Sequence, residues 1–371
     1  MKKKIWMMLL CGALVCFPLG GCGINRADAD TGSVQSEAAS DHKTTKNSNA
    51  EYTSEVFAMD TYMTLTAYGE NAKEAVEAGI AEIQRLDALL SIGDANSEVA
   101  QINQNGGGTL SEDTDYLVKR ALAIYQSTQG AFDISIYPVM QLWGFTTGDF
   151  AVPSKEDLAA KLALVNAGRI SLMEDNGVSS ITLPEGMEID LGGIAKGYTS
   201  GRVMEVIKRY GIESAVINLG GNAHVLGSKP DGSAWKVGIQ DPNDTNGYLG
   251  GVSVRDKAII TSGGYERYFV DEATGVKYHH IIDPKTGYSA NNGLISVTIV
   301  SADSTLADGL STSLFVLGTE DAIAYCEEHC AEDGFDAIME DEDGKLYITD
   351  GVMDDFINMN NTANIQEIKT K

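Results

Sequence analysis

Apolar residues recur at three- and four-residue steps in several segments of the chain. In Asn71–Leu90, the positions Ala75, Val76, Ile80 and Ile83 fall on one face of a helix. The same period marks the segments Thr114–Ser127, Lys155–Asn166, about Ile194 to Tyr210, Ser304–Leu317 and Glu320–His329. We predict a helix over each of these segments, with its apolar face against a core.

Shorter runs of alternating or uniformly apolar residues predict strands. Phe57–Tyr68 alternates apolar and small polar residues, as a half-buried strand does. Further strand candidates are Ile181–Leu183, Met187–Leu191, Ala215–Leu219, Trp235–Ile239, Gly251–Val254, Ala258–Thr261, Arg267–Val270, Lys277–Ile282, Leu294–Ile299, Ala337–Met339 and Leu346–Thr349. The glycines of Asn105–Gly108 predict a loop. Because helices and strands mix without strict β-α-β alternation, we expect an α+β fold: a single domain of mostly antiparallel sheets packed by helices.

The first residues predict an export signal that is not part of the fold. Three lysines within residues 1–4 precede an apolar run to Leu19, which is too short for a comfortable transmembrane helix. Leu19-Gly20-Gly21-Cys22 resembles a bacterial lipobox, which implies cleavage before Cys22 and lipidation of that residue. An ordinary secretory signal with a chance cysteine is the alternative. With a lipid anchor, the protein would lie on the extracytoplasmic face of the cell membrane.

The segment that follows lacks the apolar residues of a packed core. Residues 22–50 are rich in Ser, Thr, Asp, Asn and Lys, so we expect a disordered tether there. The predicted organisation is therefore a signal peptide over 1–21, the tether over 22–50, one folded domain over 51–360 and a C-terminal tail over 361–371.

The 371-residue chain is strongly acidic, with 27 Lys and Arg against 53 Asp and Glu and a formal net charge of −26. This balance excludes a protein that binds the nucleic-acid backbone, because such binding needs basic patches. Cys326 and Cys330 lie four residues apart with His329 between them. They indicate either a metal site or, as the alternative, core or surface thiols or a facultative disulfide.

A glycine corner follows the strand candidate that ends at Asp190. Gly192 and Gly193 turn the chain, and the predicted helix begins with Lys196 in its first turn. Backbone N–H groups at such a helix start can cradle phosphate. The order of residues matches neither a Walker A loop nor G-x-G-x-x-G. A plain strand-to-helix turn with a surface lysine remains the alternative.

Polar side chains gather on one side of the predicted helix Ser304–Leu317. Asp308, Ser311 and Thr312 lie at i, i+3 and i+4, opposite a row of leucines. A carboxylate and two hydroxyls so placed could offer oxygen ligands to Mg²⁺; the alternative is a solvated helix face. Gly309 costs this helix about 1 kcal/mol relative to Ala, which favours a close approach to the backbone at that point.

Three further stretches have two interpretations each. In Tyr278–Gly287, His280 precedes an Asp-Pro turn at Asp283, so it is either a general base or a strand histidine on the solvated face. Gly130–Phe145 and the glycine-rich link Thr261–Arg267 could bind a flat ring and its hydroxyls, or belong to the core.

Taken together, these stretches resemble one family, the FAD:protein FMN transferases, or ApbE family of flavin-trafficking lipoproteins. The matching pieces, in chain order, are Met59-Asp60-Thr61, Ala131-Phe132-Asp133 with Leu142-Trp143-Gly144-Phe145, Asp190-Leu191-Gly192-Gly193-Ile194-Ala195-Lys196-Gly197, Asn218-Leu219-Gly220-Gly221-Asn222, Ser262-Gly263, His280-Ile281-Ile282-Asp283-Pro284 and Ala307-Asp308-Gly309-Leu310-Ser311-Thr312. The resemblance covers about Phe57 to Leu317. One position departs from the family pattern: Gly93 stands where many members have a Tyr that contacts the flavin nucleotide.

The resemblance implies a Mg²⁺-dependent enzyme that splits FAD, attaches FMN through a phosphoester to a Thr or Ser of an extracytoplasmic redox protein, and releases AMP. By the same resemblance, the residues that contact FAD are Met59, Ala131, Phe132, Asp133, Asp190, Lys196 and Ile282. Mg²⁺ would lie among Gly193 (through its carbonyl), Asp308, Ser311 and Thr312, with His280 as base and Asp283 assisting it. An FAD pyrophosphatase that yields FMN and AMP, and a flavin-binding lipoprotein without catalysis, are the alternatives.

Overall fold

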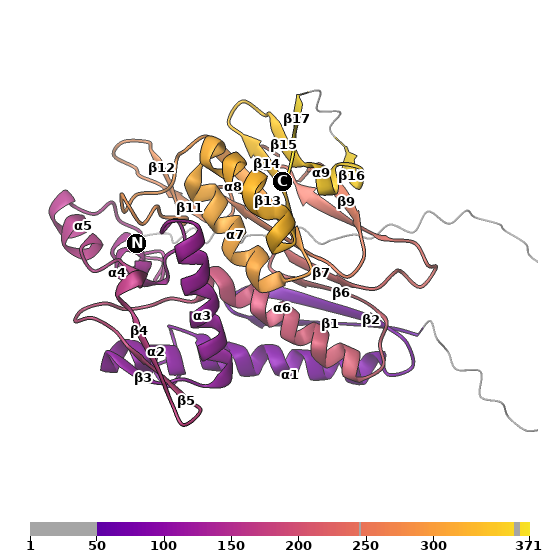
Figure 1. Ribbon diagram of the computed structural model, residues 1–371, viewed down its shortest axis with the longest axis horizontal. Coiled ribbons are helices and arrows are strands. Elements are labelled where there is room, and N and C mark those ends of the chain that lie inside the picture. The colour runs from indigo at the N-terminus through magenta and orange to yellow at the C-terminus, as the bar shows by residue number, and fades with distance from the viewer. Residues whose placement is uncertain (1–49, 245, 360–363) are drawn as a thin grey trace, which may run out of the picture.

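A nine-stranded sheet forms the frame of the computed structural model, which describes residues 50–244, 246–359 and 364–371 (Figure 1). Its strands, in spatial order, are β1 (Glu51–Ala58), β2 (Thr61–Tyr68), β6 (Ser214–Leu219), β7 (Asn222–Leu226), β10 (Ala258–Gly263), β13 (Leu294–Ser301), β14 (Phe335–Asp341), β15 (Leu346–Thr349) and β17 (Ile365–Ile368). Neighbouring strands are antiparallel except β15 and β17. The sheet therefore allows short connections between most of its neighbours.

Four helices cover one face of this sheet: α1 (Ala72–Leu90), α6 (Gly192–Arg209), α7 (Ser304–Leu317) and α8 (Thr319–Asp333) (Figure 1). Their apolar stripes bury residues such as Leu86, Ile207 and Leu314 against the inward side chains of the strands. The other face is covered by a three-stranded sheet of β8 (Trp235–Gln240), β9 (Tyr248–Val254) and β16 (Phe356–Asn358). The described part of the chain thus has a core on each side of the central sheet.

The remaining elements lie toward one end of these layers. The helices among them are α2 (Glu98–Asn105), α3 (Glu112–Ser127), α4 (Tyr137–Trp143) and α5 (Lys155–Leu162), whereas the short α9 (Asp350–Met353) packs against β14, β15 and β17. The strands are β3 (Gly107–Thr109), β4 (Ser171–Asp175) and β5 (Val178–Thr182), which form a small antiparallel sheet, and the hairpin of β11 (Tyr268–Val270) and β12 (Lys277–His279). The predicted α+β class with mostly antiparallel sheets is confirmed, and each predicted helix is present, although α5 ends at Leu162.

Two predicted strands were wrong. Phe57–Tyr68 is not one strand but the second part of β1, a turn at Met59 and Asp60, and β2. A two-residue turn keeps the alternation of inward and outward side chains in step, so the pattern could not reveal it. Met187–Leu191 is not a strand, because its backbone is held by single contacts: Asp190 N–H donates to the Ile134 carbonyl, and Ile189 N–H to the Asn103 side chain.

Two further differences concern the predicted loop and the predicted C-terminal tail. In the predicted loop Asn105–Gly108, Gly107 begins β3, which pairs with β5. The predicted tail over 361–371 contains β17, which pairs in parallel with β15 and forms an edge of the central sheet. Both strands are too short to show a clear alternation of apolar and polar residues. They are strands because they pair with β5 and β15. The predicted signal peptide, Cys22 and the tether to residue 49 lie outside the described residues.

Helices α6 and α7 cross at very close range at Gly197. A Cβ atom there would lie 2.2 Å from the Ser304 carbonyl oxygen and 2.6 Å from Cβ of Asp308. A glycine is also required at position 309, on the other side of α7, because a Cβ atom of Gly309 would lie 2.5 Å from Cδ1 of Ile124 in α3. The close approach predicted at Gly309 is therefore helix packing.

We expect Gly197→Ala to lower the free energy of unfolding by about 1–3 kcal/mol, because the added methyl group would push α7 away from α6. Gly201→Ala is the matched control on the same helix, since its Cβ would meet only the Ser304 hydroxyl, at 3.0 Å. Urea unfolding of the two variants measures the difference. Equal stability of both variants would show that the crossing can relax without cost.

Candidate functional site

A cavity of about 680 Å³ opens where the start of α6, the middle of α7 and the end of β10 meet. It brings together residues from distant parts of the chain. All seven predicted FAD contacts line it: Met59, Ala131, Phe132, Asp133, Asp190, Lys196 and Ile282. The predicted metal ligands Gly193, Asp308 and Thr312 line it too, as does the predicted base His280. Ser311 and Asp283 are not among its lining residues.

The α6 corner is shaped by Asp190 and by the two glycines. Asp190, two residues before α6, accepts a hydrogen bond of 2.8 Å from the N–H of Gly192, the first residue of that helix. Gly193 lies against the ring of Phe132, which a Cβ atom would meet at 3.0 Å. The positive end of α6 and the Lys196 ammonium thus face the same cavity. This geometry favours an anionic ligand over the alternative of a plain turn.

Asp308 is buried at the α6–α7 crossing, with 5% of its surface exposed. Its carboxylate accepts hydrogen bonds from the Gly197 N–H at 2.7 Å and from the Asn222 amide at 3.1 Å. Burial raises the pKa of this carboxyl, while Lys196 opposes the rise. The alternative of a solvated helix face is therefore wrong, because the carboxylate lies inside the protein and its hydrogen-bond donors are neutral.

Hydroxyl groups surround the same point of α7. The Ser262 hydroxyl of β10 lies 2.9 Å from the Ser311 hydroxyl and 3.3 Å from the Thr312 hydroxyl. Ser311 also donates to the Asp308 carbonyl at 2.9 Å and is fully buried, which explains why it does not line the cavity. Ser262 belonged to a stretch noted in the sequence, but its contact with both hydroxyls required the fold.

The donor set fits Mg²⁺ better than a softer metal. It contains one buried carboxylate, hydroxyl oxygens and a helix-start carbonyl, and Mg²⁺ prefers a few such oxygens together with phosphate and water. Among the described residues, no three His, Cys, Asp or Glu side chains are grouped to hold a metal by themselves. A divalent ion would thus depend on oxygens supplied by the ligand, and its charge would compensate the buried Asp308 carboxylate.

Glu266 is a functional candidate that sequence reasoning did not assign. It lines the cavity, and burial raises the pKa of its carboxyl to about 7, with Lys196 acting in the opposite direction. Burial likewise raises the pKa of Asp190. Six carboxyls line the cavity beside Lys196 and Arg267: those of Asp60, Asp87, Asp133, Asp190, Glu266 and Asp308. Only the folded chain reveals this concentration of charge, because the residues come from distant segments.

His280 lies just beyond β12 and is half-buried in the cavity wall. Its Nδ1 lies 3.2 Å from the Arg267 carbonyl oxygen, which can only accept. Nδ1 therefore carries the proton, and Nε2 keeps a lone pair. Burial, together with Arg267 and His279, lowers the pKa of His280 to about 3, so the ring is neutral at pH 7. The position fits a general base.

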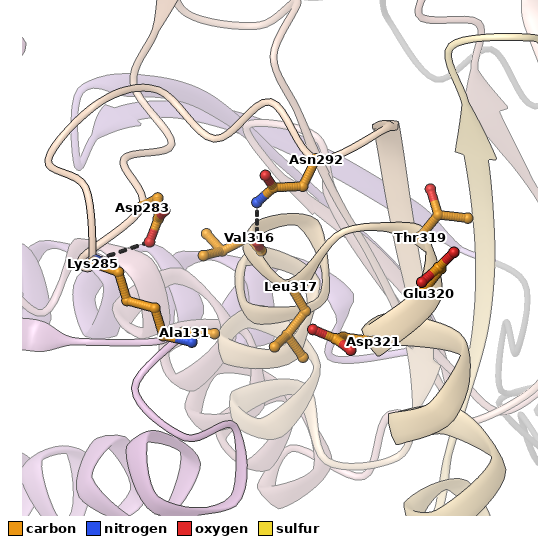
Figure 2. Close-up of a pocket in the computed structure, with 9 residues that line it drawn as sticks. All are labelled: Ala131, Asp283, Lys285, Asn292, Val316, Leu317, Thr319, Glu320 and Asp321. Atoms are coloured by element: carbon orange, nitrogen blue, oxygen red, sulfur yellow. Dashed lines mark hydrogen bonds between the residues drawn. The ribbon is translucent and has the colours of Figure 1, made fainter.

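Asp283 is placed differently from its predicted role. Its two carboxylate oxygens accept hydrogen bonds from the Lys285 N–H at 2.8 Å and the Thr286 hydroxyl at 3.1 Å, so they stabilise the turn. The side chain lines a second, more open cavity of about 600 Å³ at the end of α7, shown in Figure 2 with Lys285 reaching toward Ala131. The structure thus assigns Asp283 to the turn and does not place it beside His280 in the main cavity.

The turn between β1 and β2 holds Met59 at the cavity wall. Met59 and Asp60 both have positive φ, 48° and 59°, which is uncommon for residues other than glycine. The Met59 N–H donates to Asp87 of α1 at 3.1 Å, and the Thr199 hydroxyl of α6 lies 3.7 Å from its sulfur. Asp87 also lines the cavity and was missed from the sequence. These contacts stabilise an otherwise strained turn.

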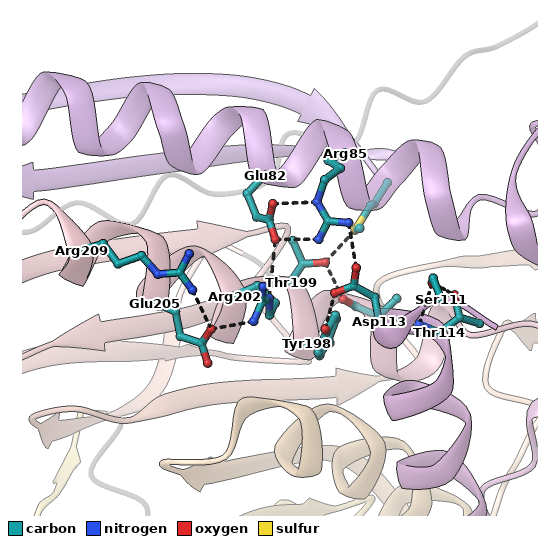
Figure 3. A network of polar contacts seen from close by, with 12 residues as sticks. Glu82, Arg85, Ser111, Asp113, Thr114, Tyr198, Thr199, Arg202, Glu205 and Arg209 are labelled. Atoms are coloured by element: carbon teal, nitrogen blue, oxygen red, sulfur yellow. Dashed lines mark hydrogen bonds and ion pairs between the residues drawn. The ribbon is translucent and has the colours of Figure 1, made fainter. Parts of the chain in front are cut away.

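A polar network behind the cavity fixes α6 relative to α1 and α3 (Figure 3). Arg85 donates to Glu82 at 2.8 Å and to Asp113 at 2.7 Å, and the Tyr198 hydroxyl donates to Asp113 at 2.5 Å. Arg202 continues the network along α6. Tyr198 lies two residues after Lys196, so the network supports the helix turn that faces the cavity.

The aromatic residues of the stretch Gly130–Phe145 are divided between the cavity and the core. Phe132 and Phe145 line the cavity, whereas Trp143 is fully buried and donates to the Gly287 carbonyl at 2.8 Å.

Cys326 and Cys330 are buried free thiols of α8, which confirms the core alternative. Within residues 50–244, 246–359 and 364–371, no helix is long and apolar enough to cross a membrane.

Comparison with known proteins gives consistent matches. The family model described as "ApbE family" matches residues 59–339. The chain is 38% identical over 247 residues to a protein of Klebsiella pneumoniae (strain 342) named FAD:protein FMN transferase, covering 65% of this chain and 75% of the relative. It is 32% identical over 324 residues to a protein of Treponema pallidum (strain Nichols) with the same name, covering 82% and 88%.

Solved structures agree with these matches. The crystal structure of an ApbE protein from Thermotoga maritima superimposes with a TM-score of 0.75 at 32% identity and covers 81% of this chain and 98% of its own. A structure titled flavin transferase ApbE from Vibrio cholerae gives a TM-score of 0.70 at 29% identity, covering 81% and 97%.

Proposed function

The chain belongs to the ApbE family and is an FAD:protein FMN transferase, and we propose that it uses Mg²⁺ to transfer FMN to a Thr or Ser hydroxyl of an extracytoplasmic redox protein. The observation that supports the metal is the buried Asp308 carboxylate, which faces the same cavity as Lys196 and the start of α6. Lys196, the start of α6 and a bound divalent ion would together supply the positive charge that a diphosphate needs, against the cavity's carboxylates and the chain's net charge of −26.

In this proposal the residues divide the work of binding and proton transfer. Lys196 and the amides of the α6 start bind the diphosphate of FAD, and Phe132 with Met59 contacts its flat groups. When bound, Mg²⁺ would neutralise phosphate oxygens beside Asp308 and Thr312. Nε2 of His280 accepts the proton of the Thr hydroxyl as the hydroxyl oxygen forms a bond to the phosphorus of the FMN moiety. The bond from that phosphorus to the bridging oxygen breaks, and AMP leaves.

The location of the enzyme is also part of the proposal. The lipobox-like Leu19-Gly20-Gly21-Cys22 supports lipidation of Cys22, which would anchor the protein to the cell membrane on its extracytoplasmic face. Membrane redox subunits or secreted flavoproteins there are the expected acceptors. Labelling of the full chain with a palmitate analogue, compared with Cys22→Ser, tests the anchor.

A single reaction tests the proposed activity. The full chain in detergent is mixed with FAD, Mg²⁺ and a redox domain that carries phosphoester-linked FMN in its native form and is purified without it. We expect a mass gain equal to FMN on the acceptor threonine, and AMP in equal amount. FMN that remains free while AMP appears would instead establish the pyrophosphatase alternative.

Gly93 gives a further prediction about FAD binding. It lines the cavity, its φ lies outside the left-handed region, and a Cβ atom would meet only the Ser91 hydroxyl at 3.7 Å. A Tyr ring there could stack on the nucleotide, so we expect Gly93→Tyr to lower the FAD dissociation constant about two- to tenfold. Fluorescence titration with FAD measures it, and Gly93→Ala, which adds no ring, is the control. Equal affinities of the two variants would contradict a stacking position.

A further inference from the structure

Two large aromatic side chains lie exposed beside the turn that enters the cavity. Phe57 is 60% exposed and Tyr62 is 69% exposed, and they face each other across β1 and β2 with ring centroids 5.0 Å apart. We call Phe57 and Tyr62 the aromatic pair. Exposed rings of this size are candidates for protein contacts, because burying them releases much apolar surface from water.

The position of the aromatic pair connects it to the site. Ala58 and Thr61 separate it from Met59 and Asp60, and these last two residues line the cavity. Elsewhere the outward residues of β1 are polar, so the apolar surface is confined to the end of the hairpin nearest the cavity. β1 is also an edge strand of the central sheet, which leaves room for a partner to approach from the side.

From this position we propose that the aromatic pair is the docking site of the acceptor protein. The inference rests on the proposed function, in which a protein hydroxyl must reach the bound FAD. A macromolecular acceptor, unlike FAD, has to be held outside the cavity while one side chain enters it. The aromatic pair is continuous with the cavity wall and is not itself among the residues that line the cavity.

The charges around the aromatic pair indicate the chemistry of the partner. Glu55 and Asp60 are exposed on either side of it along the hairpin. An apolar side chain of the acceptor between the two rings, flanked by Lys or Arg, would complement both features. Since Coulomb attraction between exposed charges is screened by salt, docking of this kind weakens as ionic strength rises.

The double variant Phe57→Thr/Tyr62→Thr tests the proposal, because threonine keeps the strand propensity and removes the rings. The acceptor is the unflavinylated redox domain described above, and the full-length enzyme is used. We expect KM for the acceptor to rise at least about tenfold, with the FAD dissociation constant unchanged. Met173→Thr/Val178→Thr is the matched control, since these residues are 66% and 53% exposed on the β4–β5 hairpin and do not line the cavity.

Each other result would overturn the docking site. An unchanged KM for the acceptor would show that the rings do not contact it. A parallel loss of FAD affinity would show that the aromatic pair belongs to the nucleotide site. If sedimentation shows that the pair joins two copies of this chain while KM stays unchanged, its partner is the enzyme itself. Failure of the proposed function is distinguishable, because the unmodified enzyme would then transfer no FMN to any acceptor.

Discussion

Replacing Asp308 by alanine is expected to abolish FMN transfer, with a loss of about a thousandfold or more in kcat. Asp308 is the only carboxylate among the predicted metal ligands, and it is buried beside Lys196. Without it, Thr312 and the Gly193 carbonyl would offer a divalent ion only neutral oxygens. We therefore expect the variant to lose its response to Mg²⁺ between micromolar and millimolar concentrations, which a titration of AMP release measures.

The control for this experiment must separate metal binding from helix packing. Asp308 also accepts hydrogen bonds from Gly197 and Asn222, so its removal affects the crossing of α6 and α7. Asn222→Ala removes one of these bonds and keeps the carboxylate, and Ser313→Ala removes a buried hydroxyl of α7 that bonds to the Gly309 carbonyl. Both should retain their Mg²⁺ response. Full FMN transfer by Asp308→Ala at ordinary Mg²⁺ concentrations would contradict the metal assignment.

The sequence predicted the parts of the site that are local in the chain. The corner from Asp190 to Lys196 is a contiguous stretch of seven residues, and helical spacing groups the polar side chains of α7. Their meeting in one cavity was an implication of the family resemblance. The close contact that brings them together, at Gly197, has no periodic signal, because it depends on the crossing of two helices.

Residues that act through tertiary contacts could not be found in this way. Glu266 and Asp87 are single acids in segments with other structural tasks, and only burial in the cavity distinguishes them from the many exposed acids of the chain. Asp283 shows the opposite error. Its position after His280 and Ile282 implied a shared role, but its carboxylate accepts hydrogen bonds from Lys285 and Thr286 within its own turn and lines the neighbouring cavity.

His280→Ala is expected to lower the rate of FMN transfer about 10²- to 10⁴-fold, the usual contribution of a general base, and to leave the FAD dissociation constant nearly unchanged. The ring is neutral because burial, Arg267 and His279 lower the pKa of His280 to about 3. Protonation of this residue in the free enzyme therefore cannot reduce activity between pH 8 and pH 5. When FAD binds, its phosphates raise the pKa again, since nearby negative charge stabilises the imidazolium.

The rise in the pKa of His280 on FAD binding makes its imidazole a stronger base in the enzyme–FAD complex than in the free enzyme. This difference between the two states provides the test. In the enzyme–FAD complex, kcat should fall at a higher pH than kcat/KM for FAD, which refers to the free enzyme. The difference should disappear in His280→Ala and persist in His329→Ala, whose ring lies on α8 outside the cavity. If His280→Ala keeps both the rate and the separation of the two pH profiles, another group, with Glu266 the nearest candidate by charge and burial, removes the proton.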